Sequence, residues 1–200
     1  MHLIGQPAPD FTAAAVLGDG SLEPQFNLHA QIKTRHAILF FYPLDFTFVC
    51  PSELLALHHR IAAFAQRKAE VIAVSIDSEF THLAWRNTPV DRGGIGPVAY
   101  PMVADPSHRI LKAYGVQALS GDVALRATFL IDSDGIVRHQ SINDLPLGRN
   151  VDECLRLLDA LQFHEQHGDV CPAGWQQGAP GMHASPQGVA SYLKEHASSL

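Results

Sequence analysis

The sequence predicts an α/β fold with a mixed central sheet. Short apolar segments alternate with stretches whose apolar residues have helical spacing, and this alternation is typical of α/β proteins. Towards the end of the alternation, two strand-like segments are separated by one tight turn. Such a pair is antiparallel, so we expect a sheet that combines parallel and antiparallel strands.

Three central strands are expected from short apolar runs. They are Ala37–Tyr42 (AILFFY), Val71–Ile76 (VIAVSI) and Ala127–Asp132 (ATFLID). The third run is followed by the turn Ser133-Asp134-Gly135 and then by IVRHQ, which predicts a hairpin. A further turn is expected near the N-terminus at Gly18-Asp19-Gly20.

Four helices are expected where apolar residues recur at spacings of three and four, or where a glycine ends a short helical pattern. They cover Pro51 to about Lys68, about Glu79 to just before Pro89, His108–Gly115, and Asn150 to about His164. After Gly168 the chain is rich in Gly, Pro and Gln, so we expect mostly irregular structure with a short closing helix at Val189–His196. Residues 1–165 are therefore expected to form the main domain and residues 166–200 a C-terminal extension.

Composition narrows the classes of function. The chain has 200 residues and a net charge of −6, and its 14 basic residues are scattered, which argues against nucleic acid as the main partner. The first residues, MHLIGQPAPDF, lack the basic and long apolar parts of a signal peptide. All apolar runs are far shorter than the roughly 20 residues that cross a bilayer. We therefore expect a soluble protein of the cytoplasm.

The three cysteines have to be considered one by one, because an odd number in a chain of this kind does not indicate a disulfide framework. Cys50 directly precedes Pro51, which is favoured at the first helical position, so Cys50 is expected at the helix N-cap. Unpaired backbone N–H groups and the helix dipole would there stabilise a thiolate. Position alone leaves two interpretations open: a buried packing residue or a reactive thiolate.

Two other kinds of cysteine site are disfavoured. A dithiol oxidoreductase of the thioredoxin type needs a second cysteine three residues after the first, and Glu53 occupies that position. A zinc site is not supported either, because no Cys or His lies at ligand spacing from Cys50. The pairs His58-His59 and His164/His167 match no ligand set and are interpreted as exposed helix residues.

The stretch around Cys50 resembles a known family. Pro43-x-x-x-Thr47-x-x-Cys50 resembles the active-site signature of peroxiredoxins, and FYPLDFTFVCPSE is similar to its form in the typical 2-Cys class. Four further segments resemble that class in the same order: Ala84–Asp105, Arg126–His139, Leu147–Arg156 and His167–Trp175. The resemblance covers nearly the whole chain. It implies a thioredoxin-like fold and a cofactor-free thiol peroxidase for hydrogen peroxide and small organic hydroperoxides.

The resemblance also implies roles for individual residues. Cys50 matches the peroxidatic cysteine, whose thiolate attacks a peroxide and becomes a sulfenic acid. The other matches are Arg126 as the active-site arginine, Thr47 as the residue that orients the peroxide, Pro43 as the shield of the pocket, and Glu53 and Arg149 as a supporting charged pair. Each has an ordinary alternative, since an arginine at a strand edge, a threonine in extended structure, a strand-ending proline and a charge at a helix end are all common. Trp85 matches a position near the pocket and is interpreted as a core residue.

The second redox residue implied by the resemblance is Cys171, because VCPAGW matches the segment of the resolving cysteine. In typical 2-Cys relatives this thiol comes from the other subunit, which implies a homodimer, commonly assembled into a ring of five dimers. Cys154 has helical spacing with its apolar neighbours and is interpreted as a packing residue.

The physiological reductant is expected to be thioredoxin or a dedicated flavoprotein disulfide reductase. A different class of function stays open beside the peroxidase, namely a holdase chaperone or peroxide sensor in which peroxide chemistry is secondary. A thioredoxin-like dithiol reductase remains disfavoured by Glu53.

Overall fold

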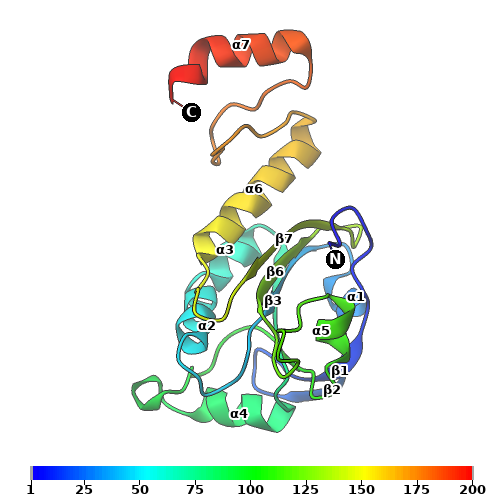
Figure 1. The fold of residues 1–200 in the computed structure, drawn as a ribbon, viewed down its shortest axis with the longest axis vertical. Coiled ribbons are helices and arrows are strands. Elements are labelled where there is room, and N and C mark those ends of the chain that lie inside the picture. Colours follow the sequence, from blue (N-terminus) through cyan, green and yellow to red (C-terminus); the bar gives the residue numbers. More distant parts are fainter. Residues whose placement is uncertain (1, 200) are drawn as a thin grey trace. The chain divides into compact units, whose positions relative to one another are not determined.

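The structure is a computed structural model, and it describes residues 2–199. Seven strands form one sheet in the order β2-β1-β5-β4-β3-β6-β7 (Figure 1). The strands are β1 (Thr12–Val16), β2 (Leu22–Asn27), β3 (His36–Phe41), β4 (Ala69–Ser75), β5 (Met102–Ala104), β6 (Arg126–Ile131) and β7 (Val137–Asn143). Strands β3, β4 and β5 are parallel to one another, and the remaining pairs are antiparallel. The predicted mixed sheet is confirmed.

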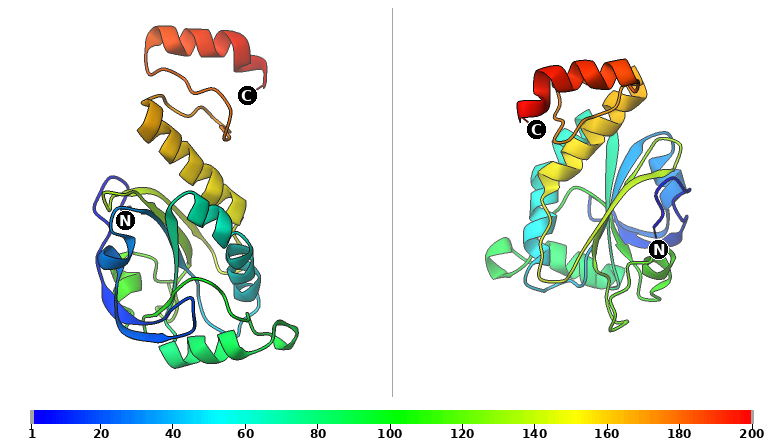
Figure 2. Two further views of the ribbon diagram at one scale, coloured as in Figure 1. Left: turned by 180° about the vertical axis from the view of Figure 1, so that it is seen from behind. Right: turned by 45° about the horizontal axis from the view of Figure 1, so that its top comes forward.

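Residues 2–199 form seven α-helices, and some of them cover the two faces of the sheet (Figure 1). They are α1 (Leu28–Ile32), α2 (Cys50–His59), α3 (Ile61–Gln66), α4 (Glu79–Asn87), α5 (Arg109–Ala113), α6 (Val151–His167) and α7 (Pro186–His196), with short 3₁₀ turns at Val90–Arg92 and Ala197–Ser199. Figures 1 and 2 show α2 and α3 on one face and α1 and α5 on the other. No helix among the described residues is long and apolar enough to cross a membrane.

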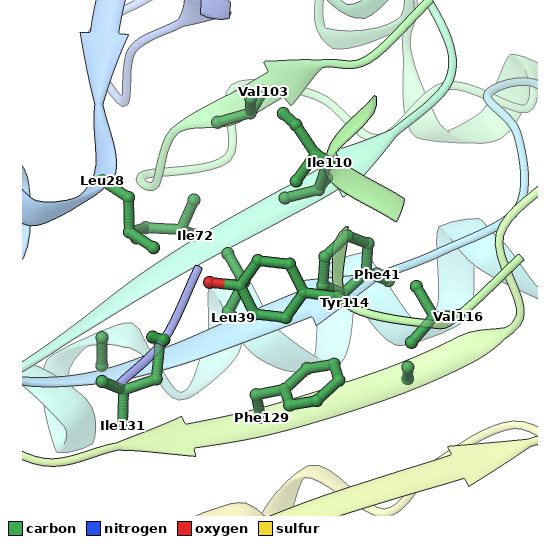
Figure 3. Packing of buried hydrophobic residues seen from close by; sticks show 14 of the residues in the cluster. Leu28, Leu39, Phe41, Ile72, Val103, Ile110, Tyr114, Val116, Phe129 and Ile131 are labelled. Carbon is green, nitrogen blue, oxygen red and sulfur yellow. The ribbon is translucent and has the colours of Figure 1, made fainter. Parts of the chain in front are cut away.

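The hydrophobic core on the α1 and α5 side follows from side-chain alternation along the strands. Leu39 and Phe41 of β3 point to this face because successive residues of a strand point to opposite faces. Phe41 packs against Tyr114 and Phe129 with ring centroids 5.2 and 5.8 Å away (Figure 3). Aromatic contacts of this kind add to the stabilisation from burial. Phe40, between Leu39 and Phe41, is directed to the opposite face, where the candidate site lies.

Several predicted helices differ from the structure in their bounds: α5 covers only Arg109–Ala113, and α6 extends to His167. The single helix expected from Pro51 to about Lys68 is two helices, α2 and α3, because Arg60 leaves helical geometry with φ −110° and ψ 3°. Its N–H donates to the carbonyl of Leu57, three residues back, and its own carbonyl accepts from the next turn. The closing helix α7 begins three residues before the predicted Val189. Ser185 caps it through the N–H of Gly188.

The described chain divides into two compact units, one ending at Val151 and the other beginning at Asp152. The second unit contains α6, α7 and the connection between them. In that connection Val170 and Met182 exchange two backbone hydrogen bonds of 2.9 Å, so it is more ordered than its composition indicates. Trp175 is buried there against Phe163, with ring centroids 4.9 Å apart. The boundary expected between residues 165 and 166 stays a prediction.

Candidate active site

Cys50 is the first residue of α2, and the N-cap is Val49. The prediction that Cys50 itself is the N-cap was therefore wrong by one position, because the helix already includes Cys50 and Pro51 becomes its second residue. The electrostatic consequence is the same at either position. Cys50 lies in the first turn, where the backbone dipoles of the helix present their positive end, and Pro51 removes one unpaired donor.

The sulfur of Cys50 is fully buried and has two polar neighbours. The hydroxyl oxygen of Thr47 lies 3.0 Å from Sγ, and Nη1 of Arg126 lies 3.4 Å from it. Thr47 comes from the loop before α2, whereas Arg126 is the first residue of β6. The fold thus brings two polar groups to the sulfur of Cys50: a hydroxyl from 3 residues away in the sequence and a guanidinium from 76 residues away.

Arg126 is held in a fixed orientation. Its Nε donates to the carbonyl of Leu145 at 2.6 Å, and Nη1 donates to Oε2 of Glu53 at 2.8 Å. The side chain is 5% exposed. A buried guanidinium requires such partners, because an unpaired charge away from water is very costly. One edge of the group is therefore occupied by the protein, while Nη1 also reaches Cys50.

Glu53 joins Arg126 to a second arginine, Arg149. The backbone N–H and Nε of Arg149 donate to Oε1 of Glu53 at 2.8 and 2.9 Å, and Nη2 donates to Oε2 at 3.0 Å. Burial acts to raise the pKa of Glu53, but the hydrogen bonds and charge of Arg149, with the charge of Arg126, outweigh it and lower that pKa. Glu53 is thus an ionised, 2% exposed carboxylate between two guanidinium groups.

Arg149 is anchored to the sheet as well. Its Nη1 donates to the carbonyl of Ala127 at 2.7 Å, and its guanidinium lies over the ring of Phe40, 3.2 Å from the centroid. Stacking of a guanidinium on an aromatic ring is favourable when both are buried. Glu53 and Arg149 therefore connect the start of α2 to β3 and β6.

Pro43 is buried in the loop between β3 and α2, four residues before Thr47. Trp85 on α4 is fully buried, as expected for a core residue. Its indole N–H donates to the carbonyl of Gly93 at 2.9 Å, and its ring packs against Phe46 of the same loop, 5.7 Å between centroids. Helix α4 thus packs against the loop that carries Pro43 and Thr47.

The other two cysteines belong to the second unit. Cys171 follows α6, is partly buried, and its thiol donates to the carbonyl of Ala160 at 3.3 Å. Burial raises the pKa of Cys171, although the positive charge of Arg156 acts in the opposite direction. A raised pKa keeps this group as a thiol at neutral pH. Cys154 is buried on α6.

Sequence reasoning missed a polar cluster beneath the same loop. Asp45, Asp77 and His82 lie within 4.8 Å of one another by their ligand atoms, the one such group among residues 2–199 that could hold a metal ion. Asp45 and His82 bond to each other at 2.7 Å, and Asp77 accepts from the N–H of Asp45 and from Ser75. These atoms are engaged with the protein itself. The members are up to 37 residues apart, so no local pattern pointed to them.

Comparison with known proteins identifies the family. The AhpC/TSA family matches residues 4–140, and the C-terminal domain of 1-Cys peroxiredoxin matches residues 160–195. Alkyl hydroperoxide reductase C of Helicobacter pylori is 53% identical over 198 residues, which cover 99% of this chain and 100% of that protein. Peroxiredoxin-2 of Macaca fascicularis is 45% identical over 193 residues, 96% of each protein.

A solved structure agrees with these relatives. The reduced 2-Cys peroxiredoxin of Plasmodium vivax has a TM-score of 0.93 and 48% identity, covering 97% of this chain and 100% of that one. The match confirms the thioredoxin-like fold and the resemblance to 2-Cys peroxiredoxins. The chain therefore belongs to the AhpC/TSA family of peroxiredoxins, and it is a thiol-dependent peroxidase.

Proposed function

We propose that Cys50 is the peroxidatic residue and reduces hydrogen peroxide and small organic hydroperoxides. The observation that carries the proposal is the placement of a hydroxyl 3.0 Å and a guanidinium 3.4 Å from one buried sulfur. The thiolate attacks one oxygen of ROOH, and the O–O bond breaks. An S–O bond forms, the leaving RO⁻ takes a proton to become ROH, and Cys50 becomes a sulfenic acid.

The neighbouring groups have separate roles in this step. Arg126 stabilises the thiolate before attack and the negative charge that develops on the leaving oxygen. Thr47 orients the peroxide by hydrogen bonding. Pro43, buried and without an N–H, shields the pocket from water. Glu53 and Arg149 hold Arg126 and the start of α2 in place.

The charges of the buried cluster favour the reactive form of Cys50. Two guanidinium groups and one carboxylate leave one net positive charge beside the sulfur. A thiolate at Cys50 brings the cluster to neutrality, and a neutral buried cluster avoids the cost of an unbalanced charge. Arg126, the arginine that contacts the sulfur, is also the one with only a single hydrogen bond to Glu53.

We further propose that Cys171 of a second subunit resolves the sulfenic acid. Its thiol attacks the oxidised sulfur of Cys50, a disulfide forms, and the oxygen leaves as water. The raised pKa of Cys171 fits this order of events, because the group stays protonated and inactive until it is exposed for attack. The extension 166–200 carries it in a segment separate from the peroxidatic domain.

A homodimer would supply that second subunit. Strand β7 pairs with β6 alone among the described strands and lies at one edge of the sheet. An edge strand is a surface for pairing with another chain. Exposed aromatic side chains, Phe46, Phe48 and Phe80, lie on the loop before α2 and on α4. Apolar side chains of this size at a surface indicate a further interface, as a ring of five dimers would provide.

Recycling requires an external dithiol that opens the Cys50–Cys171 disulfide and leaves as a disulfide itself. Thioredoxin or a dedicated flavoprotein disulfide reductase would supply it, in the reducing environment of the cytoplasm. This chain needs no cofactor of its own for these steps, because two electrons pass from the sulfur of Cys50 to the peroxide oxygen and the later exchanges run between sulfur atoms. The proposed role in the cell is antioxidant defence.

Turnover of hydrogen peroxide by cysteine variants tests the proposal. Cys50→Ser is expected to abolish turnover with a thioredoxin system, and Cys171→Ser to consume about one peroxide per subunit and then stop. Cys154→Ser is the matched control and should retain activity near that of the wild type. Near-normal turnover by Cys50→Ser would show that the peroxidatic assignment is wrong.

A further inference from the structure

The peptide group between Leu44 and Asp45 connects the reactive site to the polar cluster beneath it. Its carbonyl oxygen accepts the hydroxyl proton of Thr47 at 2.7 Å. Its N–H, on the other side of the same planar group, donates to Oδ2 of Asp77 at 2.9 Å. Because a peptide group is rigid and planar, Asp77 determines where the carbonyl that binds Thr47 points.

A hydroxyl has one proton and two lone pairs. Thr47 lies 2.7 Å from the Leu44 carbonyl and 3.0 Å from Sγ of Cys50. A carbonyl and a thiolate can both only accept, so the single proton of Thr47 serves one of these two acceptors at a time. When it is directed to the Leu44 carbonyl, a lone pair of the Thr47 oxygen faces the pocket and accepts from the O–H of a bound hydroperoxide.

Asp77 is itself held in position. Its Oδ2 accepts from the hydroxyl of Ser75 at 2.6 Å, and its backbone N–H donates back to that hydroxyl oxygen at 3.2 Å. Ser75 ends β4 and is 1% exposed. The carboxylate therefore joins the last residue of a central strand to the loop before α2, a rigid support for a residue that must be positioned.

The side chain of Asp45 holds the same peptide group at the Cα of Asp45. Oδ1 accepts from the hydroxyl of Tyr42 at 2.7 Å, and Oδ2 lies 2.7 Å from Nδ1 of His82. Nε2 of His82 faces the carbonyl of Val103 at 3.2 Å and so carries a proton. Both carboxylate oxygens of Asp45 are therefore held by buried partners.

Phe46, the next residue, has a strained backbone conformation that the surrounding contacts maintain. Phe46 has φ +53°, a left-handed conformation that residues other than glycine rarely adopt. Such conformations persist where surrounding contacts determine the backbone. Here Asp45 is anchored on one side and Thr47 on the other, and the ring of Phe46 packs on Trp85.

We propose that Asp77 is a positioning residue for the peroxidase reaction, which it serves by orienting the Leu44–Asp45 peptide and thereby the hydroxyl of Thr47. The inference rests on the role proposed for Thr47 above. Hydrogen bonds in such a chain polarise one another, so loss of the first weakens the orientation of the last. Asp77 touches neither the sulfur nor the peroxide.

Two rates measured on the same reduced variants test the proposal. The first is the rate of reaction with hydrogen peroxide. The second is the rate of alkylation of Cys50 by iodoacetamide, measured by mass spectrometry of the peptide that contains Cys50. Alkylation needs the thiolate but no oriented peroxide. The variants are Asp77→Ala, Asp77→Asn, Thr47→Val and the double variant Thr47→Val/Asp77→Ala. Ser78→Ala is the matched control, because it removes the cap of α4 beside Asp77 without touching the Leu44–Asp45 peptide.

Asp77→Ala is expected to lower the peroxide rate about 10- to 100-fold while the alkylation rate changes by less than about threefold. Asp77→Asn should retain most of the peroxide rate, since its amide oxygen still accepts from the N–H of Asp45. Ser78→Ala should keep both rates. In the Thr47→Val background, Asp77→Ala should cause no further loss, because the two residues act through one path.

Four results would overturn the proposal. Equal losses of both rates in Asp77→Ala would indicate general damage to the pocket, and an additive loss in the double variant would indicate a separate path. If Thr47→Val reacted slowly with hydrogen peroxide but Asp77→Ala reacted at the wild-type rate, the role of Asp77 would be refuted while that of Thr47 would stand. A Thr47→Val variant as fast as the wild type would instead refute the proposed role of Thr47, and that of Asp77 with it.

Discussion

At the scale of single residues, the site depends on one carboxylate between two guanidinium groups. Glu53 receives four hydrogen bonds from the side chains of Arg126 and Arg149 and the backbone of Arg149. Removing one member of a buried ion pair leaves the others unbalanced, which is far more destabilising than the loss of a surface pair. The proposed reactivity of Cys50 and the stability of the fold therefore depend on the same side chain, Glu53.

Glu53→Gln is expected to lower the free energy of unfolding at pH 7 by about 3 kcal/mol, because both arginines lose their counter-charge. The pKa of Glu53 is lowered in the folded state. Its stabilisation is thus complete above the unfolded pKa near 4.5 and is lost as the pH falls through the lower folded value. Urea unfolding from pH 7 to pH 3 should show a larger loss in the wild type than in Glu53→Gln, which keeps only the loss from other carboxylates with a lowered pKa, such as Asp132.

The control for this prediction is Glu153→Gln, which alters an exposed pair with Arg156 on α6. That change should cost less than about 1 kcal/mol. A similar loss of stability in Glu53→Gln and Glu153→Gln would contradict a large stabilisation by the buried cluster.

Arg126→Lys keeps the charge but not the geometry. A lysine ammonium has no planar fork that could reach the Leu145 carbonyl, Glu53 and Cys50 together. The second-order rate with hydrogen peroxide is expected to fall about 100-fold. Arg138→Lys, at a half-exposed arginine paired with Asp132, provides the control and should react at the wild-type rate. An unimpaired Arg126→Lys would show that charge alone is sufficient.

At the scale of elements, the long apolar strands and periodic helices were predictable from the sequence, and the short elements were not. Strand β1 (TAAAV) contains three alanines, which do not favour strands, and β2 contains Pro24, which is tolerated only at a sheet edge. Strand β5 and helix α1 have three and five residues, too few for a periodic signal. Their formation depends on pairing with distant segments.

The same reasoning explains which site residues could be predicted. Pro43, Thr47, Cys50 and Glu53 lie in one continuous motif, so a resemblance could point to them together. Asp77 and His82 hydrogen-bond to the backbone and to the side chain of Asp45, respectively. Only the fold brings them beneath the loop, because parallel strands β3 and β4 end side by side.

One loop between elements gives a sharp prediction. A Cβ at Gly94 would run into the backbone carbonyl and Cβ of Thr88, so Gly94→Ala should destabilise the protein by about 2–3 kcal/mol. Gly135→Ala is the control. Its Cβ would meet nothing, and only the positive φ of 79° opposes it, at a cost of about 1 kcal/mol. Thermal unfolding of the two variants measures the difference, and equal effects would contradict the close approach at Gly94.

At the scale of the whole molecule, the two thiols that are proposed to react lie in different compact units of the chain. Cys50 belongs to the unit that ends at Val151, and Cys171 to the unit that begins at Asp152. In the structure neither sulfur is in a disulfide, and Cys171 donates to Ala160 within its own unit. The proposed catalytic cycle needs local opening around both sulfurs before the resolving thiol, which in the proposal comes from a second subunit, can reach Cys50.

The most direct test of this account mixes Cys50→Ser and Cys171→Ser subunits, each of which lacks one of the two thiols. After refolding together and treatment with one equivalent of peroxide, the mixture should give a disulfide-linked dimer on a non-reducing gel, and mass spectrometry should find the Cys50–Cys171 link. Either variant alone should run as a monomer on the same gel, because it cannot form the Cys50–Cys171 disulfide. A mixture that stays monomeric while the oxidised wild type forms a disulfide within one chain would contradict the account.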